Sequence, residues 1–170
     1  MGMYDSVKFF SDKPKCGAGH EPEGWQTKDL KNDMATYYVV DGRFYGHLRS
    51  EDDWQEKIVE VDQSGIVLSL THRSKAEVFT GSILVYTHCK KCQPVFTDVQ
   101  AVWNDGLAPH EPWVEYELTF ADGVLVKSEP VKLETRESMR EDLTKHGLRV
   151  MPDDDRVVQK RIQQWREGKR

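Results

Sequence analysis

The sequence predicts a mainly β protein of the α+β type, with antiparallel, hairpin-rich sheets and a C-terminal two-helix tail. Short runs rich in β-branched and aromatic residues fill most of the chain, and turn-forming residues separate them. Asp41-Gly42 and Asp122-Gly123 each lie between two such runs, which is the strongest short-range signal of a hairpin. After residue 134 the apolar residues change from a period of two to a helical period.

The first part of the chain is expected to hold a short strand and a hairpin. Residues 7–10 form a β-type run, and the loop that follows, residues 11–24, is rich in proline and glycine. Residues 34–40 alternate between apolar and polar side chains, Asp41-Gly42 turns the chain, and residues 43–45 run back. Both turn residues of such a hairpin need positive φ, which glycine and aspartate tolerate.

The middle of the chain is expected to add further hairpins. Turn-forming segments at residues 62–65, 104–106 and 121–123 connect runs with β-type composition. Strands that are joined in sequence order by short turns form antiparallel sheets. The expected strands are residues 57–61, 66–70, 82–87, 94–103, 113–120 and 124–126.

Two helices are expected after the last strand. Thr135 and Ser138 are both suitable N-cap residues for the first helix, and Ser138 has capping-box spacing to Glu141. Gly147 is a suitable stop for this helix. The acidic residues 153–155 are expected to cap the second helix.

The second helix is expected to be amphipathic. Val158, Ile162 and Trp165 are spaced so that they form one apolar stripe, which must be buried against another surface. We therefore expect an antiparallel β body of residues 1–133 and a helical tail of residues 134–170, packed on the body or on a partner.

The net charge of −5 argues against a generally basic nucleic-acid-binding protein. The charge is unevenly distributed, however, because residues 156–170 are strongly basic. Such a segment can dock on the acidic body of the protein or reach an acidic partner, and nucleic acid is a candidate partner there. The alternative is a surface helix whose apolar stripe packs on the body. The predicted partner-binding residues are Lys160, Arg161, Arg166, Lys169 and Arg170.

Three cysteines carry the sharpest motif in the sequence. Cys89 and Cys92 form a C-x2-C pair at the end of an expected strand, a spacing that suits a zinc knuckle. Cys16 and His20, in the glycine-rich loop, supply a second pair of metal ligands. The sequence therefore predicts a structural zinc site in a zinc-ribbon-like element, formed by Cys16, His20, Cys89 and Cys92, with His88 as the alternative fourth ligand.

Two other interpretations of the cysteines stay open. Reduced cysteines can fill a core as small hydrophobic side chains. A redox pair is the second alternative, but such pairs usually open a helix after a strand, whereas residues 94–97 continue as β-type sequence. An odd number of cysteines, two of them close together, is typical of a reducing compartment.

Signals for catalysis are weak. The remaining histidines match no HExxH motif, and the sequence contains neither a phosphate-binding glycine loop nor a nucleophile elbow. The acidic runs at residues 51–53 and 153–155 have the oxygen atoms that Mg²⁺ prefers, but a solvated loop and a helix cap are the commoner roles of such runs. The histidines concerned are His47, His72, His110 and His146.

No apolar run approaches the roughly 20 residues that a membrane-spanning helix needs. The N-terminal residues lack the pattern of a signal peptide. Together with the cysteine usage, this predicts a cytoplasmic protein without a membrane partner.

Several segments resemble a group of uncharacterised small proteins of tailed bacteriophages, which begin with Met-Phe/Tyr-Asp-x-Val and carry an aromatic-Gln-Thr/Ser-Lys segment. The resemblance covers about half of the chain and implies a phage origin, expression in the host cytoplasm and a metal-ribbon-like element. The group often has a CxxC-like pair in the first loop, where this chain has His20 at a wider spacing. The matching segments are residues 3–8, the Cys16 loop, residues 25–30, the strand around Tyr37, residues 86–89 with Cys92, and residues 122–125.

These observations predict a phage-encoded, non-enzymatic binding protein that inhibits or redirects a host factor in host takeover or anti-defence. The predicted partner is a host protein or protein complex. One alternative is a virion structural component. Another is a metal-dependent enzyme acting on nucleic acid or nucleotide, which needs an open position on its metal.

Overall fold

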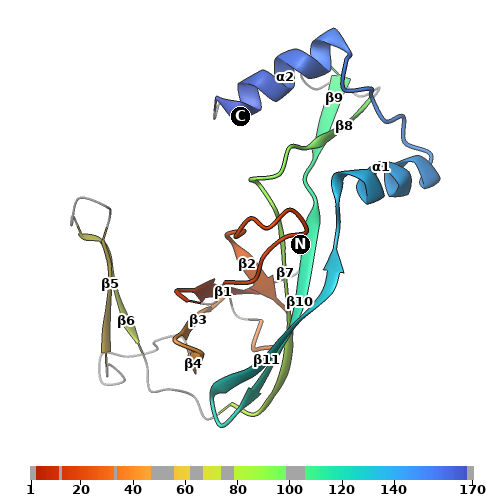
Figure 1. Ribbon diagram of the computed structural model, residues 1–170. Helices are drawn as coiled ribbons and strands as arrows, with labels where there is room; N and C mark the ends of the chain where they lie inside the picture. The colour runs from red at the N-terminus through yellow and green to blue at the C-terminus, as the bar shows by residue number, and fades with distance from the viewer. Residues whose placement is uncertain are drawn as a thin grey trace. The chain divides into compact units, whose positions relative to one another are not determined.

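The fold is mainly β, and two helices follow the last strand (Figure 1). A computed structural model describes residues 3–11, 13–32, 34–46, 56–61, 67–73, 79–98 and 106–167.

The chain divides into two compact units. The sequence-based boundary after residue 133 had placed residues 15–23 and 87–114 in the β body, but in the structure these segments belong to the same unit as both helices. Both cysteine-bearing segments therefore lie in the helical unit. The first unit comprises Met1–Pro14, Gly24–Tyr86 and Glu115–Val131, and the second comprises Lys15–Glu23, Thr87–Val114 and Lys132–Arg170.

A closed barrel of seven strands has the order β1-β2-β7-β10-β11-β4-β3. Three of these strands, β7, β10 and β11, have residues in both units. The strands are β1 (Asp5–Phe9), β2 (Trp25–Thr27), β3 (Thr36–Val40), β4 (Arg43–Tyr45), β7 (Gly81–His88), β10 (Trp113–Ala121) and β11 (Val124–Leu133).

Two predicted hairpins of the barrel are confirmed. Asp41 and Gly42, between β3 and β4, have φ values of 49° and 71°. Asp122 and Gly123, between β10 and β11, have φ values of 49° and 75°. Positive φ at both turn positions gives the backbone twist that matches two flanking antiparallel strands.

Aromatic rings fill the centre of the first unit. Phe44 is fully buried, stacks on Tyr37 with ring centroids 5.4 Å apart, and lies 4.9 Å from the ring of Phe120. Ile83 and Val85 are buried at alternate positions of β7. This alternation is what a strand with one face toward the core requires.

A buried carboxylate holds a parallel strand pair that the sequence did not predict. Strand β1 pairs antiparallel with β2 but parallel with β3. Asp5 is fully buried, and its two carboxylate oxygens accept hydrogen bonds from the backbone N–H groups of Asn32 (2.7 Å) and Ala35 (3.0 Å). These bonds fix the segment that leads into β3. Turn signals predict only antiparallel neighbours, so the parallel pair had no signal of its own.

Two further sheets each have two antiparallel strands. Strands β5 (Glu56–Val61) and β6 (Val67–Arg73) form the second predicted hairpin, whose turn at residues 62–65 lies outside the described residues. Strand β8 (Val95–Asp98) pairs with β9 (Leu107–His110). Residues 99–103 of the strand predicted over 94–103 are also outside the described residues.

Three strand predictions need correction. Strand β9 was not predicted, since its sequence, Leu-Ala-Pro-His, contains a proline and lacks β-branched and aromatic residues of the Val, Ile or Phe type. Strand β2 was not predicted either, because it is only three residues long. Strand β11 was expected to end at residue 126 but continues to Leu133. The later residues of β11 are almost all exposed. Because neither face of this part of the strand is buried, its sequence lacks the regular alternation of apolar and polar residues that identifies a half-buried strand.

Both predicted helices form. Helix α1 (Arg136–Lys145) begins after Thr135, which makes a capping box with Ser138. Ser138 is therefore the partner inside the box, and the alternative box with Glu141 does not form. Helix α2 (Arg156–Arg166) begins after Asp155, whose side chain accepts hydrogen bonds from two backbone N–H groups. Neither described helix is long and apolar enough to span a membrane.

The apolar stripe of α2 packs within the second unit. Val158 and Ile162 are buried against Phe96 of β8, and Leu107 and Met151 pack around them. Trp165, the third member of the predicted stripe, is only partly buried. The apolar stripe of α2 therefore packs on the two-stranded sheet β8–β9 of its own unit.

Asp153 joins the two helical segments. Arg136 donates two hydrogen bonds to its carboxylate, at 2.6 and 2.7 Å, and Arg140 donates a third at 2.5 Å. Asp155 caps α2. These two residues of the acidic run thus have structural roles.

Candidate metal centre

The loop of residues 15–23 folds back on itself and places His20 beside Cys16. The Gly19 N–H donates to the Cys16 carbonyl (2.8 Å), and the Cys16 N–H donates to the His20 carbonyl (2.9 Å). Gly19 has a φ of 81°, a conformation that residues with a side chain rarely adopt. The tight turn therefore needs this glycine, and it brings two potential ligands together within five residues of sequence.

The second pair of ligands lies in a turn at the end of β7. The Cys92 N–H donates to the Cys89 carbonyl (3.1 Å), which closes the turn. The Cys89 N–H donates to the Pro112 carbonyl (2.9 Å), which holds the turn against the start of β10. Thr87 donates its hydroxyl to the carbonyl of Glu23 (2.8 Å) and so ties this region to the end of the 15–23 loop.

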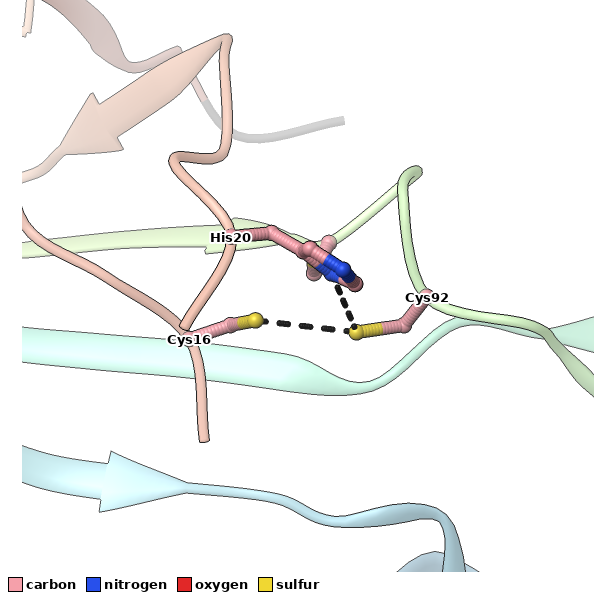
Figure 2. A group of neighbouring side chains, drawn as sticks. Cys16, His20 and Cys92 are labelled. Atoms are coloured by element: carbon pink, nitrogen blue, oxygen red, sulfur yellow. Dashed lines mark hydrogen bonds between the residues drawn. The ribbon is translucent and has the colours of Figure 1, made fainter. Parts of the chain in front are cut away.

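Four donor atoms from these two segments converge. The Sγ atoms of Cys16 and Cys92 are 3.6 Å apart, and the Nδ1 atom of His20 lies 3.4 Å from Sγ of Cys92 and 3.9 Å from Sγ of Cys89. All four donor atoms lie within 4.8 Å of one another. Figure 2 shows the side chains of Cys16, His20 and Cys92 pointing toward a common centre.

These distances fit a tetrahedral zinc ion. With Zn–S bonds of about 2.3 Å and a Zn–N bond of about 2.0–2.1 Å, a regular tetrahedron has sulfur–sulfur edges of about 3.8 Å and sulfur–nitrogen edges of about 3.6 Å. Three of the six distances among the four donor atoms are 3.6, 3.9 and 3.4 Å, within a few tenths of an ångström of those edges. The four residues are therefore placed so that they could bind one metal ion.

The cluster is buried on one side and open on the other. Cys89 is fully buried and Cys16 nearly so, whereas Cys92 is partly exposed and His20 is exposed. Burial raises the pKa of Cys89, and burial together with the neighbouring thiols raises that of Cys92. Burial also opposes ionisation of Cys16, but hydrogen bonds to the backbone of Ala18 and His20 and to both other thiols lower its pKa. A bound cation removes the repulsion that keeps three such thiols from ionising together.

His88, the alternative fourth ligand, is turned to other partners. Its Nδ1 atom lies 3.1 Å from the Glu111 carbonyl, and its ring meets the Trp113 ring edge to face at 4.9 Å. A carbonyl accepts, so Nδ1 carries the proton in this contact. The structure thus brings His20, and not His88, into the cluster.

A pocket of about 510 Å³ lies elsewhere in the second unit, lined by residues of β7, β9, β10, β11 and α1. In its wall, His110 is bonded through Nε2 to the Thr97 hydroxyl (2.8 Å), and burial lowers its pKa. Glu134 accepts a hydrogen bond from the Trp113 N–H (2.8 Å) and forms an ion pair with Lys132. Sequence reasoning missed this pocket because its residues come from segments far apart in the chain.

The predicted partner-binding residues lie at the end of the chain. Lys160 and Arg166 are exposed, and Arg161 is half-buried. Arg166 donates to the Gln93 side chain (3.3 Å), so the end of α2 lies beside the Cys89–Cys92 turn. Lys169 and Arg170 lie outside the described residues, as do His47 and the acidic run at 51–53.

No family model, curated protein or solved structure matches the chain.

Proposed function

We propose that the chain is a binding protein whose second unit is stabilised by one structural zinc ion on Cys16, His20, Cys89 and Cys92. The observation that carries the zinc is the convergence of three sulfur atoms and one imidazole nitrogen within 4.8 Å of one another, with three of the distances close to tetrahedral edges. Thiolates and imidazole suit zinc, whereas magnesium and calcium prefer oxygen ligands.

A structural role follows from the number of ligands. Catalytic zinc keeps one position for water or substrate, whereas four side chains fill every position of a tetrahedral ion. The ion would join the 15–23 loop to the turn after β7, which are 69 to 76 residues apart. Thr87, near the end of β7, also donates one hydrogen bond to the carbonyl of Glu23 in that loop.

Metal analysis tests the zinc. Protein purified without chelator should contain about one zinc per chain, as one four-ligand site requires. The cobalt-substituted protein should show the visible absorption bands of a tetrahedral ion with thiolate ligands. Zinc-free protein with an unchanged melting temperature, or cobalt in octahedral geometry, would overturn the zinc proposal.

The binding function is proposed for the basic surface around the end of α2. Lys160 and Arg166 are exposed on this helix, and Lys90 and Lys91 are exposed in the cysteine turn beside it. Positive side chains on a surface attract acidic partners and accelerate association. Together with the resemblance to bacteriophage proteins, this supports an acidic host protein or complex as the partner, in the host cytoplasm.

A charge-removal variant tests the binding function. The Lys160→Gln, Arg166→Gln double variant should keep its fold and bind the host partner more weakly, with a smaller dependence on salt. Lys145→Gln, an exposed change on α1, is the matched control. A partner recovered equally well by the double variant and the wild type would contradict the proposed surface. Binding of a short DNA duplex in place of host protein would assign the surface to nucleic acid.

A further inference from the structure

The three thiols of the cluster differ sharply in their access to solvent. Cys89 is 0% exposed and Cys16 is 4% exposed, whereas Cys92 is partly exposed. Of the three cysteines, Cys92 is therefore the most accessible to an oxidant dissolved in water. Thiolate character and exposure together decide which cysteine is oxidised, and a zinc-bound cysteine is already a thiolate.

A second thiol lies next to this exposed one. Sγ of Cys16 is 3.6 Å from Sγ of Cys92, which is about 1.5 Å longer than a disulfide bond. The two residues are 76 positions apart and belong to different segments of the second unit. The alternative partner in the C-x2-C motif, Cys89, is the most buried of the three cysteine residues.

We propose that Cys92 is an oxidation-sensitive modification site and that Cys16 is its disulfide partner, so that a hydroperoxide exchanges the zinc for a Cys16–Cys92 disulfide. This inference rests on the proposed zinc site. The disulfide keeps the 15–23 loop joined to the turn after β7, which is the connection that the zinc provides in the reduced protein. A Cys89–Cys92 disulfide would instead leave the loop without a covalent link to that turn.

The chemistry balances in two steps. The Cys92 thiolate attacks one oxygen of hydrogen peroxide, the O–O bond breaks, and Cys92 sulfenic acid and hydroxide form. The Cys16 thiolate then attacks the Cys92 sulfur, the S–O bond breaks, and the hydroxyl leaves as water after taking a proton. Two thiolates are oxidised, one peroxide is reduced, and zinc leaves because only Cys89 and His20 remain as ligands.

The sequence allows a direct test, because trypsin places each cysteine in its own peptide. Cleavage after lysine gives residues 16–28, 76–90 and 92–127, with Lys90 and Lys91 separating Cys89 from Cys92. Zinc content is first measured in the reduced protein. Hydrogen peroxide is then added in steps, while a chromogenic chelator reports released zinc and mass spectrometry maps the linked peptides.

We expect residues 16–28 linked to residues 92–127, with about one zinc released for each disulfide formed. A link from 76–90 to either other peptide as the main product would overturn the proposal. So would zinc that stays bound while the disulfide forms. A reduced protein without zinc would sink the proposed zinc site, whereas the peptide map would still identify the thiol pair.

A second measurement compares the reactivity of the three thiols in the native protein. It needs no substituted protein, which could fail to fold. Brief alkylation of the native, zinc-bound protein with iodoacetamide should label Cys92 before the other two thiols. Equal labelling of all three cysteines, or faster labelling of Cys16 or Cys89, would contradict the role of Cys92.

Discussion

The Nδ1 atom of His20 lies 3.4 Å from the Sγ atom of Cys92, although 72 residues separate them in the chain. His20 is exposed, so its imidazole closes the cluster from the solvent side and contributes little to any core. Its substitution should therefore act on metal binding more than on packing.

His20→Ala should lower zinc affinity by more than about 100-fold, because the loss of even an outer-sphere partner of a metal ligand lowers affinity about 10- to 100-fold. His88→Ala is the matched control: it removes a neighbouring exposed histidine that does not lie in the cluster. Competition with a chelator of known affinity measures both. Equal losses in the two variants would mean that His20 is not a ligand.

Asp153 should stabilise the second unit in a pH-dependent way. Hydrogen bonding from Arg136, with the charge of that residue and of Arg140, holds the pKa of the Asp153 carboxyl below its usual 3.8. A folded-state pKa below the unfolded one means that the stabilisation is complete well above the unfolded pKa. It is lost as the pH falls through the folded-state value, below 3.8.

Asp153→Asn should therefore lower the free energy of unfolding by about 1 kcal/mol at pH 7, the size expected for a partly exposed multiple contact to arginine. The difference from wild type should shrink as the pH falls below 3.8. Urea unfolding over a pH series measures it. The exposed Asp154→Asn should change stability by less than about 0.5 kcal/mol, and an equal effect of both variants would contradict the role of Asp153.

Ile162→Ala should destabilise the second unit by about 2–4 kcal/mol, because it leaves a cavity against Phe96. Val157→Ala, on the exposed side of the same helix, should change stability by less than about 0.5 kcal/mol. Circular dichroism during urea unfolding compares the two. Similar values would mean that α2 does not pack on β8.

Asp5→Ala should destabilise the first unit by about 2–4 kcal/mol, because it leaves the N–H groups of Asn32 and Ala35 without their carboxylate. Lys8→Ala, an exposed change on the same strand, is the control. Hydrogen exchange should become faster at Ala35. Unchanged protection there would show that Asp5 does not hold the entry into β3.

The sequence by itself determined the features that depend on neighbouring residues. Asp41-Gly42 and Asp122-Gly123 adopt the positive φ values that their hairpins need, and Asp155 caps α2. The spacing of Val158 and Ile162 identified the buried side of that helix. The types and spacing of Cys16, Cys89 and Cys92 likewise pointed to a metal cluster.

Only the tertiary structure decided the features that depend on distant segments. The parallel pairing of β1 with β3, the extension of β11 to Leu133 and the pairing of β9 with β8 have no local signature. The sequence left His20 and His88 as competing ligands, since both lie next to cysteine segments. The choice depends on how the 15–23 loop folds back and on where the carbonyl of Glu111 lies, which are contacts between residues far apart in the chain.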